Sequence, residues 1–179
     1  MSALSAGDIR HLFELLNTEL EKTDTIGELY LVGGAVMCLA LNARPSTQDV
    51  DAIFQPAPQV RAAAARVAAL ARINPHWLND SVKGYLSAQG DFASFLELSH
   101  LRVMVAEPHY LLAMKCLAMR LAAEFHDEED VRFLLRLLDV RSYKQALEII
   151  GRYYPLERIQ QKTLYALEEL LPRSRGQGP

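Results

Sequence analysis

The spacing of apolar residues divides the chain into a front half of helices and strands and a rear half of helices alone. In residues 8–22, apolar side chains recur every three or four positions, which predicts an amphipathic helix. Short apolar runs predict four strands, at residues 29–32, 50–54, 95–98 and 101–105. Two further helices are expected in the front half, at residues 35–41 and 58–73. Residues 44–47, rich in proline and small polar side chains, are expected to form a loop, and residues 77–86 a loop with a short helix.

Beyond Glu107 the apolar pattern has the helical period throughout. Pro108 suits the first position of a helix, which is expected to run to about Glu124. A second helix is expected around residues 131–138. Signals at helix ends predict two more: one begins at Ser142, where Gln145 completes a capping box, and ends near Gly151; the other opens at Pro155.

These elements predict an α+β fold, with a small mixed sheet flanked by helices and then a C-terminal helical bundle. The seam near Glu107 predicts two parts, residues 1–107 and residues 108–179.

Composition narrows the class of protein. Half of the 179 residues are apolar, 23% are charged and the net charge is −3, so nothing indicates broad electrostatic capture of nucleic acid. The N-terminus lacks the features of a signal peptide, and no run reaches the ~20 apolar residues that cross a bilayer. A cytoplasmic protein without a membrane partner is therefore expected. Cys38 and Cys116 lie in apolar helical patterns and are expected to be buried thiols.

The candidate chemistry lies in a glycine pair followed by two aspartates. Gly33 and Gly34 follow the first predicted strand, and Asp49 and Asp51 alternate along the second, so both carboxylates face one side, about 6–7 Å apart. Two carboxylates that close repel each other unless a cation lies between them, and Mg²⁺ is commonly held by one or two carboxylates plus substrate phosphates. Glycines let the backbone approach a phosphate, and a following helix offers N–H groups. Taken singly, a double glycine is more often a tight turn and an Asp-x-Asp pair a solvated strand face.

This order of motifs resembles the nucleotidyltransferase superfamily, whose signature is a glycine pair followed by an Asp-x-Asp strand. The residues that carry it are 31–35 and 47–52. The chain is more closely similar to small bacterial nucleotidyltransferase-like proteins of uncharacterised function, akin to the toxin components of abortive-infection type II toxin–antitoxin systems. That likeness spans roughly residues 25–140 and extends to residues 77–80 and 111–115.

The resemblance implies transfer of a nucleoside monophosphate from an NTP to an acceptor: tRNA, a protein or a small molecule. Asp49 and Asp51 would hold Mg²⁺ or Mn²⁺, while Gly33, Gly34 and Thr47 would cradle the phosphates. A cognate antitoxin is a further implied partner. A different class of function stays open, namely a non-catalytic module that binds a nucleotide or a protein partner on the same fold.

Lys115 is singled out by its surroundings. Its neighbours one helical turn away are apolar, so its ammonium group must either reach out to solvent or meet an anion. The resemblance implies that this anion is the triphosphate. It also implies a site role for Asp127 and Asp130, although this pair is equally typical of a helix N-terminus.

The remaining candidates are weaker. The superfamily often supplies a third metal-side carboxylate, for which Glu97 is the first candidate and Glu107 the second. Trp77 is expected in the core. The histidines lack metal-ligand spacing, so no role is assigned to His100, His109 and His126.

Overall fold

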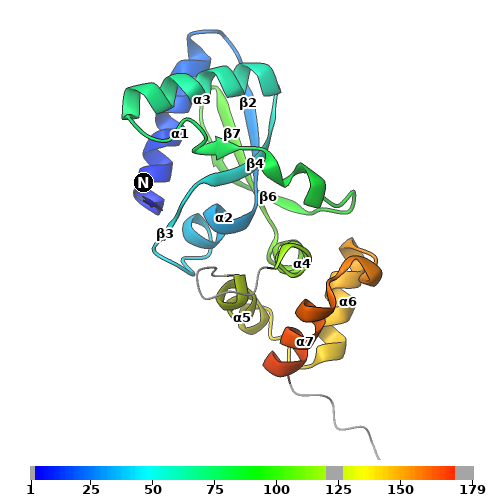
Figure 1. Ribbon diagram of the computed structural model, residues 1–179. Helices are drawn as coiled ribbons and strands as arrows, with labels where there is room; N and C mark the ends of the chain where they lie inside the picture. The colour runs from blue at the N-terminus through cyan, green and yellow to red at the C-terminus, as the bar shows by residue number, and fades with distance from the viewer. Residues whose placement is uncertain (1–2, 120–126, 172–179) are drawn as a thin grey trace, which may run out of the picture. The chain divides into compact units, whose positions relative to one another are not determined.

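The computed structural model describes residues 3–119 and 127–171, which form two compact units (Figure 1). The first unit contains the chain up to Gly84 together with Phe92–Ala106, and the second contains Tyr85–Asp91 and the chain from Glu107 onward. The predicted ranges 1–107 and 108–179 differ from these units in residues 85–91 and at Glu107, which belong with the helical unit.

The first unit is built on a five-stranded mixed sheet with strand order β5-β4-β2-β7-β6. The strands are β2 (Gly27–Leu31), β4 (Val50–Gln55), β5 (Leu78–Asn79), β6 (Phe92–Glu97) and β7 (Leu101–Ala106). Because β2 is antiparallel to β4 and parallel to β7, the first residues of β4 lie at the same edge of the sheet as the last residues of β2 and β7. The glycine pair and the two aspartates predicted as the site lie at this end of the strands.

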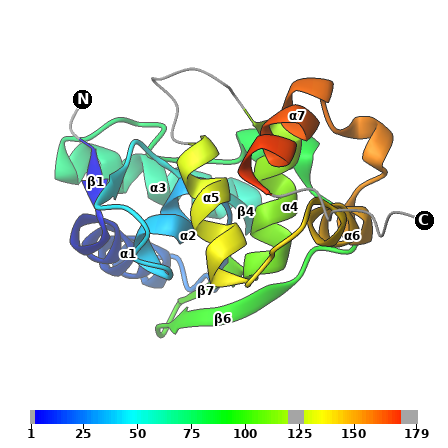
Figure 2. The same ribbon diagram turned by 90° about the horizontal axis from the view of Figure 1, so that it is seen from below.

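Three helices and a two-stranded ribbon complete the first unit. Helix α1 (Ala6–Glu21) packs against α3 (Ala57–Ala71), and both lie beside the sheet in Figures 1 and 2. Helix α2 (Gly33–Leu39) begins at the first glycine of the pair, two residues earlier than predicted. The predicted loop at residues 44–47 contains a short strand, β3 (Ser46–Thr47), which pairs with β1 (Leu4–Ser5). The predicted loop and short helix at residues 77–86 contain the two-residue strand β5 and the 3-10 helix η1 (Ser81–Tyr85).

Trp77 lies in the core, as predicted. Its side chain is 1% exposed, its indole N–H donates to the carbonyl of Ala64 at 3.1 Å, and its ring lies 6.5 Å from that of Phe13. Cys38 and Cys116 are likewise free and buried, and burial raises the pKa of the Cys116 thiol to about 12. Both thiols therefore behave as small apolar side chains.

A buried carboxylate joins α1 to α3. Glu19 is 3% exposed, and Arg66 of α3 donates to its carboxylate at 2.7 Å while Lys22 pairs with its other oxygen. The hydrogen bonds from Lys22 and Arg66 hold the pKa of Glu19 below its usual value. A carboxyl group whose pKa is lower in the folded state stabilises the fold above its unfolded pKa, and this stability is lost as the pH falls through the folded pKa.

We expect Glu19→Gln to lower the free energy of unfolding by about 1–3 kcal/mol at pH 7, because charge-assisted hydrogen bonds at a buried carboxylate are lost. The deficit should shrink as the pH falls below the unfolded pKa of about 4.3, where the wild type also loses this charge. Urea unfolding at pH 7 and pH 3 measures both values. Glu14→Gln, at an exposed position of the same helix, is the control and should change little. An equal deficit at both pH values would contradict the role of the charge.

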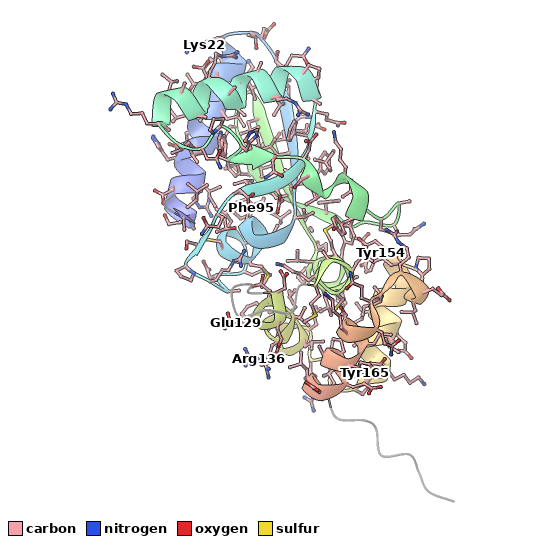
Figure 3. All side chains as sticks on the ribbon, in the orientation of Figure 1. Lys22, Phe95, Glu129, Arg136, Tyr154 and Tyr165 are labelled. Atoms are coloured by element: carbon pink, nitrogen blue, oxygen red, sulfur yellow. The ribbon has the colours of Figure 1, made fainter. Side chains whose placement is uncertain are left out.

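The second unit is helical. Its elements are α4 (Pro108–Ala118), α5 (Asp127–Leu137), α6 (Tyr143–Tyr153), the 3-10 helix η2 (Leu156–Arg158) and α7 (Gln161–Leu170). Helix α4 packs against both α5 and α6, and α7 packs against α6. Figure 3 shows Arg136 on α5 and Tyr165 on α7, both at exposed positions. No helix of the described residues has the length and apolar character needed to cross a membrane.

Helix ends in this unit follow the predicted signals in part. Ser142 and Gln145 form the capping box at the start of α6. The single helix predicted from Pro155 is wrong, because Gln160 is extended and separates η2 from α7. Helix α4 ends at Ala118 because the backbone of Met119 is not helical, and residues 120–124 of the predicted helix lie outside the described ranges.

Tyrosine side chains explain why residues 85–91 belong to the helical unit. The Tyr110 hydroxyl accepts the amide N–H of Ser87 at 3.0 Å, and the Tyr153 hydroxyl donates to the Asp91 carboxylate at 2.8 Å. Burial, together with that hydrogen bond, raises the pKa of Tyr153 to about 12, so its hydroxyl stays a donor at neutral pH. Tyr154, labelled in Figure 3, donates to the carbonyl of Tyr85 at 2.5 Å.

Candidate functional site

Asp49 and Asp51 share a hydrogen-bonded network with residues at and after β5. Asn79 donates from its amide to Asp49 at 3.1 Å, and the Ser81 hydroxyl donates to Asn79 at 2.6 Å and lies 3.4 Å from Asp51. The parallel pairing of β4 with β5 sets this contact, because it puts Asn79 opposite Asp51. The two carboxylates, both half-buried, are therefore linked by neighbouring side chains.

Gly33 lies directly against Asp51. It has a φ of +63°, a region that favours glycine, and a Cβ atom there would lie 3.2 Å from an Asp51 carboxylate oxygen. The backbone holds the same pair together, since the Val32 amide donates to the carbonyl of Asp51 at 3.0 Å. The first glycine of the pair is thus required by the turn and by the approach of the acid.

Gly34 lies against Arg44 and Thr47. A Cβ atom at Gly34 would lie 1.7 Å from Nη2 of Arg44 and 2.5 Å from the Thr47 hydroxyl oxygen. Arg44 also donates to that hydroxyl at 3.3 Å. The second glycine therefore makes room for a cation and a hydroxyl group. The structure thus brings together four of the residues proposed from the sequence. Gly33 lies against Asp51, and Gly34 lies against Thr47 and Arg44.

Glu97 is wrong as a third acid beside Asp51. Strand β6, which ends at Glu97, lies three strand positions from β4 in the sheet, about 14 Å at the usual strand spacing. The register also puts Glu97 level with Gln55, at the far end of β4 from Asp51. Its exposed side chain pairs with Arg102 at 3.6 Å.

Glu107, the second candidate, begins helix α4 in the second unit. Its amide N–H donates to the carbonyl of Asp91 at 2.9 Å, and its carbonyl accepts from Leu111 at 2.8 Å. These bonds give its backbone a structural role at the start of the helix.

In the second unit, Lys115 meets anions of its own chain. Its ammonium lies 3.1 Å from Asp127 and 2.7 Å from Asp130, and its side chain is 12% exposed. Both aspartates lie in the first turn of α5 and are almost completely buried. The anion required by the apolar surroundings of Lys115 is thus supplied within the unit. The contact of Lys115 with the triphosphate, which the resemblance implies, stays a prediction.

The donor set around the two acids is made of oxygen. Across residues 3–119 and 127–171, no group of three or more His, Cys, Asp or Glu side chains forms an arrangement that could hold a metal ion. Asp49 accepts from the Asn79 amide N–H, the oxygen of that amide accepts from Ser81, and the Ser81 hydroxyl oxygen lies 3.4 Å from Asp51. Carboxylate, amide and hydroxyl oxygens are the ligands that suit Mg²⁺ and Mn²⁺. Within the described residues, neither His100 nor His109 belongs to a group of side chains that could hold a metal ion, and His126 lies outside those residues.

Three residues of this site were not assigned from the sequence: Arg44, Asn79 and Ser81. Asn79 was within reach, because residues 77–80 already carried part of the family resemblance. Arg44 precedes the two acids by a few positions, but nothing in its spacing shows that it folds onto Gly34.

Comparison of the chain with models of protein families, with curated proteins and with solved structures finds no match.

Proposed function

We propose that the protein is a magnesium-dependent nucleotidyltransferase that moves a nucleoside monophosphate from an NTP to an acceptor. The observation that carries the proposal is the packing of Asp51 on Gly33 and of Arg44 and Thr47 on Gly34. On this proposal the first unit is a nucleotidyltransferase-like core and the second is a C-terminal helical bundle. The family resemblance adds a toxin-like role with a cognate antitoxin as partner, and the composition adds a cytoplasmic location.

The oxygen donors around the site fit the proposed metal ion. Asp49 and Asp51 would hold Mg²⁺ or Mn²⁺, and Asn79 and Ser81 keep the two carboxylates in place. When bound, the ion supplies positive charge against the phosphate oxygens. Asn79 acts as a positioning residue, because its amide donates to Asp49, and Ser81 supports it by donating to the Asn79 amide oxygen.

The transfer step is an in-line displacement at the α-phosphorus of the NTP. An acceptor hydroxyl oxygen forms a bond to this phosphorus while the bond to the bridging oxygen of the β-phosphate breaks. Pyrophosphate leaves with the bonding electrons, and the hydroxyl proton passes to water. Gly33, Gly34 and Thr47 line the side of the site where the phosphates would lie. The acceptor would be tRNA, a protein or a small molecule with a free hydroxyl group.

Lys115 is proposed, from the resemblance, to contact the triphosphate, with Asp127 beside it. Its two ion pairs support a second role, which is to neutralise Asp127 and Asp130 inside the second unit. These two roles predict different results for a variant that removes all three charges together.

One observation favours a non-catalytic binding module. Asp49 and Asp51 already have partners from their own unit, Asn79 and Ser81, so their charges are not stabilised only by a metal. A module of this kind would bind a nucleotide or a partner without transferring a phosphoryl group.

Metal-dependent nucleotide binding tests the proposal. With Mg²⁺, a saturating NTP should raise the melting temperature by several degrees, because a ligand at about 100 times its Kd stabilises by ~2.7 kcal/mol. Asp49→Asn should melt close to the wild type without ligand but lose the NTP shift, as should the wild type in EDTA. Glu97→Gln, an exposed acid at the far end of the sheet, is the matched control and should keep the shift. A shift that persists in Asp49→Asn would refute the site.

A further inference from the structure

We propose that Arg44 is the cationic residue of the first unit that binds the NTP phosphates, beside Gly33, Gly34 and Thr47. This inference rests on the proposed function and adds a phosphate ligand that the sequence did not assign. Lys115 was the only cationic side chain that the sequence analysis assigned to the triphosphate, and the inference assigns Arg44 to it as well.

The guanidinium of Arg44 lies against Gly34, the second glycine of the pair. A Cβ atom at Gly34 would lie 1.7 Å from Nη2 and 2.9 Å from Cζ of Arg44. The cation therefore occupies the space that the side chain of any other residue at position 34 would fill. The Thr47 hydroxyl, 3.3 Å from Nη2, lies beside it. The half-buried position of Arg44 on this backbone is therefore specific, unlike that of an arginine extending into solvent.

The neighbouring glycine has an acid in the equivalent place. Gly33 lies against the carboxylate of Asp51, so consecutive residues of the chain face an anion and a cation. A nucleoside triphosphate held at Asp49 and Asp51 would place its phosphates close to Arg44. Two carboxylates alone repel a polyanion, and a cation beside them offsets this repulsion.

Arginine has the chemistry that this position requires. Its guanidinium keeps its charge at all physiological pH values and offers five N–H donors in a plane, which match pairs of phosphate oxygens. The side chain of Lys115 is 12% exposed and pairs with two carboxylates of its own unit.

The competing explanation is that Arg44 only balances the charge of the acids in the folded protein. The two explanations differ in what the loss of Arg44 changes: the affinity for NTP, or stability without ligand.

Calorimetric titration of each of the four common ribonucleoside triphosphates with Mg²⁺ tests the inference. For any NTP that the wild type binds, Arg44→Gln should raise the Kd about 10- to 100-fold, the effect of losing a charge-assisted contact. The Kd of Arg44→Lys should lie between those of the wild type and Arg44→Gln, because lysine keeps the charge and lacks the planar pair of donors. Arg102→Gln, an exposed arginine of β7, is the matched control and should bind like the wild type.

Gly34→Ala provides an independent variant that keeps the arginine. The added methyl group must displace the flexible end of Arg44, so this variant should also weaken NTP binding at least about tenfold. It tests the inference even if Arg44→Gln does not fold, and melting without ligand shows whether each variant is folded.

The outcomes separate the inference from the proposed function. A wild type that binds no NTP with Mg²⁺ overturns both. A wild type that binds, with Arg44→Lys and Gly34→Ala each within about twofold of it, overturns only the role of Arg44. Weakened binding in these variants with unchanged binding in Arg102→Gln supports it.

Discussion

Supplied with Mg²⁺, α-labelled NTP and a bacterial lysate of RNA, protein and metabolites, the protein should transfer label to an acceptor. The double variant Asp49→Ala/Asp51→Ala should lower this transfer at least about 1000-fold, because several kcal/mol of charge stabilisation at the phosphates would be lost. The label must be on the α-phosphate, because the β- and γ-phosphates leave as pyrophosphate. Counting label in the RNA, protein and small-molecule fractions measures the rate and identifies the class of acceptor.

The control for this experiment is Glu97→Gln, which changes an exposed acid that sequence reasoning had placed in the site. It should transfer label at the wild-type rate. Transfer that survives the loss of both aspartates would place the active site elsewhere. Binding of NTP without transfer to any fraction would favour the binding module, since the nucleotide site would then exist without chemistry.

Lys115→Met should destabilise the second unit by about 3–5 kcal/mol, because it leaves the buried carboxylates of Asp127 and Asp130 without their cation. Urea unfolding followed by circular dichroism at 222 nm reports the helices of both units, so a transition that appears in this signal but not in Trp77 fluorescence belongs to the second unit. Fluorescence of Trp77, the only tryptophan of the chain, reports the first unit. The matched control is Lys144→Met, at an exposed position of α6, which should change stability by less than about 0.5 kcal/mol.

A triple variant separates the structural role of Lys115 from a role in binding. Lys115→Met combined with Asp127→Asn and Asp130→Asn removes the three charges together, so much of the lost stability should return. If the restored protein also keeps the full NTP shift, Lys115 is not a phosphate ligand. If Lys115→Met alone is as stable as Lys144→Met, the ion pairs contribute little to the fold.

Local sequence patterns predicted most of the elements. The alternation in residues 50–54 predicted β4, and Ser142 with Gln145 predicted the start of α6, because a strand face and a capping box depend on neighbours a few residues away. The errors also have local causes. The polar segment at Gln160 ends η2 before α7 begins, although the apolar period continues across it.

Local signals also predicted part of the site. The glycine pair and the Asp-x-Asp strand pointed to Gly33, Gly34, Asp49 and Asp51, since each of these signals is short. Thr47 was assigned as their neighbour in the chain, and the structure places its hydroxyl at Gly34. The third acid failed for the opposite reason: Glu97 has a plausible strand pattern, but only the strand order shows that it lies at the wrong end of the sheet.

By itself the sequence determined the mixed α+β character, the helical rear half and two carboxylates beside a glycine pair, because these depend on periodicity and on residues close in the chain. Only the tertiary structure decided which side chains meet them. Strand pairing brings Asn79 to Asp49, folding of the 44–47 segment puts Arg44 on Gly34, and packing of α5 on α4 gives Lys115 its aspartates. These contacts join residues that no local spacing relates, since they form only when separate elements bury their apolar faces together.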